Sequence, residues 1–99
     1  MNREIEILQK RKVRGHVLKI LELSYPTATF ESAVAAGLME RGLVSSPDIS
    51  EYTQYLEDKG LLRVIHSAGR FGIQERLLGL TPDGIDLLDG LRAAPGVEV

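Results

Sequence analysis

Two glycines limit the length of the helices that the middle of this chain can form. Gly42 follows "MER" and Gly60 follows "EDK", and two apolar residues come directly after each glycine. Glycine readily adopts the left-handed conformation that commonly ends an α-helix, so both positions predict a helix terminus. We therefore expect two short helices, one ending before Gly42 and one ending before Gly60.

Helical spacing of apolar residues predicts a first helix from Arg3 to about Ser24. This helix should stop at Tyr25-Pro26, because proline cannot continue the hydrogen-bond ladder. A second helix is expected to take Thr29 as its N-cap and to run from Phe30 to Arg41. The expected core face of this second helix consists of Phe30, Val34 and Leu38, with Ala33 and Met39 beside it.

The third predicted helix has a well-marked start in the stretch "SPDISEYTQYLEDKGLL". Ser46 is the expected N-cap, Pro47 the first helical residue, and Asp48 an acid near the positive end of the helix dipole. The core stripe of this helix is expected to contain Ile49, Tyr52 and Leu56, flanked by Thr53.

The chain after Gly60 predicts a β-hairpin and a last helix. Residues 61–66 and 73–80 are rich in apolar residues, and the glycine-containing segment 67–72 between them is typical of a turn. Thr81 followed by Pro82 predicts a helix start, and the helix should run through Leu91. Residues 93–99 offer little to bury, so we expect a flexible tail after a single domain of residues 1–92.

The order of elements is helix, helix, helix, hairpin, helix. This order predicts a mainly α (α+β) fold, the winged helix-turn-helix, in which three helices precede a β-hairpin wing and a C-terminal helix. The alternative architecture is a helical bundle with an incidental hairpin.

Two stretches resemble those of known winged-helix regulators. "YLEDKGLLRVI" resembles the end of the recognition helix and the first wing strand of MarR-like and ArsR-like proteins, and "LTPDGIDLLDG" is similar to their next helix. The whole chain also resembles a small family encoded in Mu-like bacteriophages, but that family tends to have a basic tail, whereas this chain ends in Glu98-Val99. The pieces that match the phage family are Met1 to Arg11, Tyr55 to Leu62, Leu80 to Gly90, and Pro95 to Val97.

Composition and motifs argue against an enzyme or a metalloprotein. The 99 residues include no cysteine, which excludes disulfides and thiolate metal sites. His16 and His66 have no metal-ligand spacing, and "SAGRFG" lacks the pattern of a phosphate-binding loop. No apolar run is long enough to span a membrane, and the N-terminal stretch is unlike a signal peptide. We expect a cytoplasmic protein with no catalytic residues and no cofactor.

Charge is strongly partitioned along the chain although the net charge is only −2. Residues 1–24 carry a net charge of +3 and residues 61–80 carry +2, whereas the third predicted helix carries −3. Affinity for nucleic acid depends largely on neutralising phosphates, so the first helix and the hairpin are the expected sources of affinity. The candidate phosphate-binding residues are Lys10, Arg11, Lys12 and Arg14 in the first helix, and Arg63, Arg70 and Arg76 in the hairpin.

The third helix supplies the candidate base-reading residues. Gln54 can read adenine, and Tyr55 can donate to a phosphate or pack on a sugar. Ser46 and Ser50, near the start of this helix, are further candidates. Arg70 at the hairpin tip is placed to reach a phosphate or the minor groove.

Several of these residues also have purely structural interpretations. Lys10 can pair with Glu6 one helical turn away, and Arg63 with Glu75 across the hairpin. Glu51 and Asp58 would repel a DNA backbone. The other two acids of the third helix do not count against DNA, because Asp48 is explained by the helix dipole and Glu57 by the edge of the core.

The sequence supports two functions. The first is a DNA-binding transcriptional regulator that contacts double-stranded DNA and forms a homodimer through its first and last helices. The alternative is a protein-interaction module, such as a phage accessory protein, whose acidic third helix docks on a basic partner.

Overall fold

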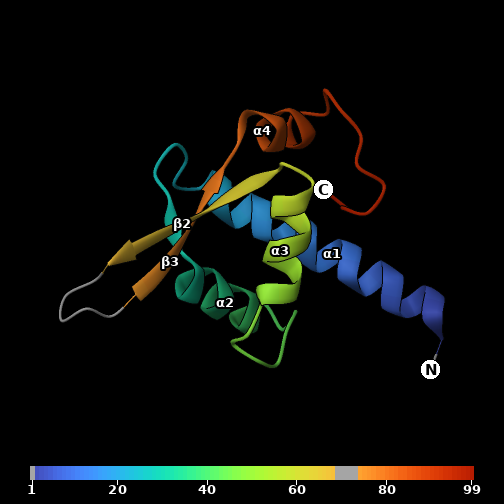
Figure 1. The fold of residues 1–99 in the computed structure, drawn as a ribbon. Helices are drawn as coiled ribbons and strands as arrows, with labels where there is room; N and C mark the ends of the chain where they lie inside the picture. Colours follow the sequence, from blue (N-terminus) through green and yellow to red (C-terminus); the bar gives the residue numbers. More distant parts are fainter. Residues whose placement is uncertain (1, 69–73) are drawn as a thin grey trace.

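A three-stranded antiparallel sheet and three shorter helices pack around one long helix (Figure 1). The computed structural model describes residues 2–68 and 74–99. In chain order the elements are α1 (Arg3–Glu22), β1 (Thr29–Phe30), α2 (Glu31–Glu40), α3 (Ser50–Asp58), β2 (Leu62–Ala68), β3 (Gln74–Leu80) and α4 (Pro82–Leu88). The order is the predicted one with the short strand β1 added, and the strands pair in the order β1-β3-β2.

The core forms around the C-terminal half of α1. Val13, Val17 and Leu21 recur every four residues and are buried, so they form one face of the helix. α2, α3 and the inner face of the sheet pack on this face, and together they exclude water from it. The N-terminal half of α1 projects from the body (Figure 1), and Ile5 and Leu8 on it are 62% and 53% exposed.

The start of α2 differs from the prediction. Thr29 is not an N-cap but the first residue of β1, where it pairs with Leu78 of β3, and its hydroxyl lies 2.6 Å from that of Ser24. Phe30 pairs with Leu77 and is 46% exposed, so it is not part of the core face. Strand pairing removes both residues from the helix, which therefore begins at Glu31 without a side-chain cap. Val34 and Leu38 are buried as predicted, whereas Ala33 and Met39 are exposed.

The start of α3 also differs from the prediction, although its end does not. Ser46 accepts a hydrogen bond from the backbone N–H of Asp48, but the helix begins only at Ser50. The hydroxyl and the backbone N–H of Ser50 donate to the Asp48 carboxylate and hold its pKa below the ordinary value. Gly42 and Gly60 have φ angles of 71° and 73° and lie just beyond the ends of α2 and α3, as predicted.

The last helix starts as predicted but is shorter. The Thr81 side chain accepts a hydrogen bond from the backbone N–H of Gly84, and Pro82 is the first helical residue. The helix ends at Leu88, and Leu91 beyond it is 74% exposed.

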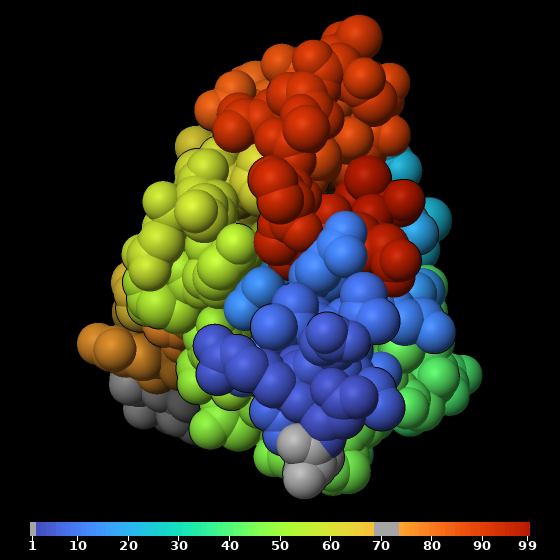
Figure 2. Space-filling model, turned by 90° about the vertical axis from the view of Figure 1, so that its right-hand side faces the viewer, coloured from blue at the N-terminus to red at the C-terminus, as the bar shows by residue number. Residues whose placement is uncertain are grey.

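The C-terminal residues 93–99 form a packed strap, not the flexible tail expected from the sequence. Val97 is only 4% exposed, and the backbone N–H of Glu98 donates to the carbonyl of Arg11. Arg14 donates to the carbonyl of Gly96 at 3.1 Å. Figure 2 shows these residues, in red, lying directly on α1, in blue. The tail is ordered because α1 offers it backbone and side-chain partners that the sequence did not reveal.

We predict that Gly15→Ala will lower the free energy of unfolding by about 1 to 3 kcal/mol, because overpacking strains a closed contact. A Cβ at this position would overlap the carbonyl oxygen of Glu98, so the strap must move. Urea denaturation measures the change.

Gly37→Ala is the matched control, since a Cβ there would meet only the flexible end of the Ile20 side chain at 3.3 Å. It should be neutral or stabilising by up to about 1 kcal/mol through helix propensity. Stabilisation of both variants would contradict the packed strap.

Candidate nucleic-acid interface

The solvent-facing side of α3 is polar. Ile49, Thr53 and Leu56 are buried against the core, and this fixes which side of the helix faces out. The exposed residues on the opposite side are Ser50, Glu51, Gln54 and Asp58. Two candidate base-reading residues, Ser50 and Gln54, are therefore accessible and lie one helical turn apart.

The two carboxylates that count against DNA binding both have partners. The Lys10 ammonium lies 3.0 Å from the Glu51 carboxylate, so Lys10 pairs across to α3 and not with Glu6. The Gln54 amide donates to the Asp58 carboxylate at 2.9 Å. Lys10 offsets the charge of Glu51, whereas the neutral amide of Gln54 leaves the charge of Asp58 in place. Exposed ion pairs contribute at most about 1 kcal/mol to stability.

The carboxylate of Glu57 has a structural role. It accepts a hydrogen bond at 3.0 Å from the backbone N–H of Val64 in β2. Glu57 therefore links the C-terminal end of α3 to the first strand of the hairpin, in keeping with its predicted place at the edge of the core.

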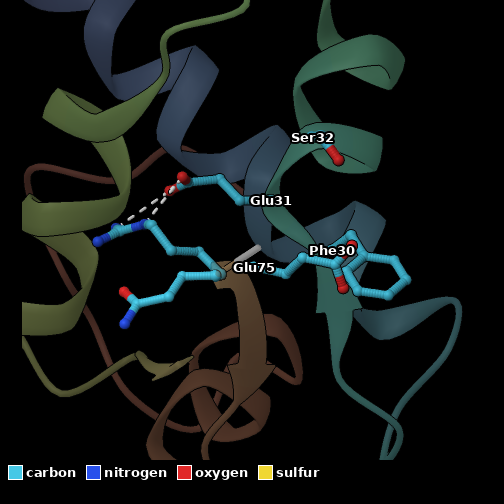
Figure 3. A pocket seen from close by; sticks show the side chains of 6 residues that line it. Phe30, Glu31, Ser32 and Glu75 are labelled. Carbon is cyan, nitrogen blue, oxygen red and sulfur yellow. Dashed lines mark hydrogen bonds and ion pairs between the residues drawn. The ribbon is translucent and has the colours of Figure 1, made fainter. Parts of the chain in front are cut away.

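Arg76 belongs to a bridge between three elements. Its guanidinium donates to both oxygens of Glu31 at the start of α2, at 2.9 and 3.2 Å, and the Thr53 hydroxyl of α3 donates to the same carboxylate at 2.9 Å. Figure 3 shows the two contacts between Glu31 and the guanidinium as dashed lines. The residues drawn there line an open hollow, whose volume is about 320 Å³. Arg76 is thus held by a bidentate ion pair, and its contact with a phosphate stays a prediction. No local pattern pointed to Glu31, because its partners lie 22 and 45 residues away in the chain.

Arg14 on α1 and Tyr55 on α3 contact each other, and neither belongs to the exposed side of α3 described above. The Arg14 guanidinium lies 3.6 Å from the centre of the Tyr55 ring, a cation–π contact. The strap covers the same ring, since a Cβ at Gly96 would overlap the Tyr55 hydroxyl. Both side chains are therefore engaged within the protein, and the DNA contacts expected of them stay predictions.

The remaining candidate DNA-binding residues differ in how exposed they are. Lys12 and Arg63 are exposed, whereas Arg11 is half-buried beneath the strap. Arg63 faces Gly79 in the strand register and Glu75 faces Ser67, so the expected pair between Arg63 and Glu75 is wrong. Ser46 is exposed in the loop before α3, and Arg70 lies outside the described residues.

Similarity to a solved structure identifies the fold. The X-ray structure of a PadR-like transcription factor from Bacteroides fragilis matches with a TM-score of 0.75 and 18% sequence identity. The match covers 91% of this chain and 85% of that chain.

The chain has a winged-helix fold. In this fold α3 occupies the position of the recognition helix and the hairpin of β2 and β3 occupies that of the wing. No protein-family model matches the sequence, and the curated proteins include no match. The resemblances to MarR-like and ArsR-like regulators and to the phage-encoded family therefore stay predictions.

Two negative findings apply to residues 2–68 and 74–99. Within them, no helix is long and apolar enough to cross a membrane. The same residues contain no group of three or more His, Cys, Asp or Glu side chains arranged to hold a metal ion.

We predict that Arg76→Ala will lower the free energy of unfolding by about 1 to 3 kcal/mol, the range for removing a hydrogen bond to a charged group. The reason is that Glu31, whose side chain is only 18% exposed, would lose its ion-pair partner. Urea denaturation followed by circular dichroism provides the measurement.

Arg63→Ala removes the same charge from the wing at an exposed position and should change stability by less than about 0.5 kcal/mol. Equal losses in the two variants would contradict a structural role specific to Arg76.

Proposed function

We propose that this protein is a winged-helix DNA-binding transcriptional regulator whose α3 enters the major groove of double-stranded DNA. The observation that carries the proposal is the exposed side of α3, where Ser50 and Gln54 are accessible and the flanking carboxylates are partnered. The shared fold of a PadR-like transcription factor supports the same function.

Gln54 is the proposed base-reading residue. Its amide can offer both a donor and an acceptor to the edge of adenine, once its hydrogen bond to Asp58 is exchanged for the base. Ser50, one turn earlier, is proposed to contact a base or a phosphate, and Ser46 a phosphate near the start of the helix. Arg63 is the proposed phosphate contact of the wing, and Arg70 stays a candidate from the sequence.

A homodimer is the proposed form of the regulator. Exposed apolar side chains at Ile5 and Leu8 on the projecting half of α1, and at Leu91 after α4, are suited to a contact between two copies. Two-fold symmetry would place two α3 helices on successive turns of one face of the duplex.

One observation favours a second function, a protein-interaction module. Three of the candidate phosphate-binding residues, Lys10, Arg14 and Arg76, are engaged in contacts within the protein. If these contacts persist, little positive charge remains beside α3, and Glu51 and Asp58 would suit a basic protein partner.

Binding to duplex DNA of random sequence, measured over a salt titration, tests the proposed function. We predict detectable affinity at low salt that falls as salt is added, because phosphate contacts release counterions. Glu51→Gln should strengthen binding several-fold, since it removes a negative charge from the α3 surface and releases Lys10 from its ion pair.

The matched control is Glu4→Gln, which removes an exposed carboxylate from the first turn of α1. It should change affinity much less than Glu51→Gln. Affinity that is absent at low salt would contradict DNA binding, and equal effects of the two variants would contradict the placement of DNA on α3.

A further inference from the structure

A row of basic residues lies on the side of α1 that faces away from α3. Residues of an α-helix are about 100° apart around its axis, so Lys12 and Lys19 point away from Lys10 and Arg14, which contact α3. His16 lies between Lys12 and Lys19 on this side. Arg41, directly after α2, completes the row by reaching His16 with a nitrogen-to-nitrogen distance of 3.2 Å. We call these four residues, Lys12, His16, Lys19 and Arg41, the basic row.

The basic row carries positive charge that the described residues leave largely unpaired. Among residues 2–68 and 74–99, no ion pair forms with Lys12, Lys19 or Arg41. Burial lowers the pKa of His16, and the charges of Lys19, Arg41 and Lys12 lower it further in that order. Glu98 of the strap is the one carboxylate with a resolved effect on His16, and it acts in the opposite direction.

The contact between Arg41 and His16 depends on the charge of the imidazole. A guanidinium can only donate hydrogen bonds, so Nδ1 of His16 must be the acceptor and the ring must be neutral. Protonation of Nδ1 would remove this acceptor and place two positive groups side by side. The Arg41 guanidinium would then be released toward solvent.

We propose that the basic row is a second DNA-binding surface, which holds the phosphate backbone of a duplex, and that protonation of His16 strengthens it. Lys12 and Lys19 are two helical turns, about 10 Å, apart along α1, so the row is extended as a polyanion chain requires. An acidic protein is a poorer fit, because protein interfaces have an apolar core and the row itself consists of four basic side chains. The proposal does not depend on contacts made by α3.

Paired lysine substitutions test the surface. Lys12→Gln/Lys19→Gln should weaken binding to random duplex DNA and lower the slope of log affinity against log salt by up to about 2, about 0.9 for each lost phosphate contact. The control is Arg3→Gln/Arg92→Gln, which removes the same charge outside the row and should leave most of the affinity.

The two histidines provide a second test with a matched pair. DNA binding should favour protonated His16, so wild-type affinity should rise as pH falls from about 7.5 to about 5.5. His16→Gln should abolish most of this rise, whereas His66→Gln, on the exposed part of β2, should retain it.

If Lys12→Gln/Lys19→Gln leaves DNA affinity and the salt slope unchanged, the proposal is overturned. A row that binds an acidic protein and not DNA would give this same result. A pH dependence that survives in His16→Gln would overturn the role of His16. The experiments distinguish the two proposed surfaces. If Lys12→Gln/Lys19→Gln changes DNA affinity but Glu51→Gln does not, the result supports binding at the basic row and contradicts binding at α3.

Discussion

The Glu31 carboxylate is the contact on which the geometry of the winged helix depends. It accepts two hydrogen bonds from Arg76 of β3 and one from Thr53 of α3, while its own backbone begins α2. Three elements therefore meet at one partly buried charge, where hydrogen bonds are stronger than at the surface. This bridge and the hydrogen bond from Val64 to Glu57 hold α3 at a defined position beside the hairpin of β2 and β3.

Internal pairing also determines the electrostatics of the surface. Arg14 lies against Tyr55 beneath the strap, Arg76 is held by Glu31, and Lys10 neutralises Glu51. The net charges counted for each segment of the sequence therefore overstate the positive charge that is available beside α3. Two further bases of α1, the exposed Lys12 and the half-buried Lys19, lie on the side of the helix that faces away from α3.

Local features of the sequence predicted the elements well. Gly42, Gly60 and Thr81 set helix boundaries through conformations and hydrogen bonds within a few residues, so a single sequence reveals them. The two-residue strand at Thr29 could not be foreseen, because it exists only through pairing with residues near position 78. Ser46 failed as a cap for a different, local reason: the Asp48 carboxylate accepts hydrogen bonds from the Ser50 backbone N–H and hydroxyl, and the helix begins only at Ser50.

The candidate site was harder to predict than the fold. Ser50 and Gln54 are exposed on the expected helix, because helical periodicity alone separates them from Leu56. Arg14 and Arg76 have partners 82 and 45 residues away in the chain, and Tyr55 is contacted by Arg14 from another helix. No local pattern encodes such contacts. The strap was missed for the same reason, since its fit depends on the missing side chain of Gly15.

The most direct test of this account is an amide NMR titration of the ¹⁵N-labelled protein with duplex DNA. Binding through α3 predicts that, within this helix, the largest changes in amide chemical shift occur at Ser50 and Gln54. The contact between Arg14 and Tyr55 beneath the strap should stay intact. Shifts confined to Tyr55 and the strap, with Ser50 and Gln54 unmoved, would show that the strap opens to bind DNA and would contradict the account.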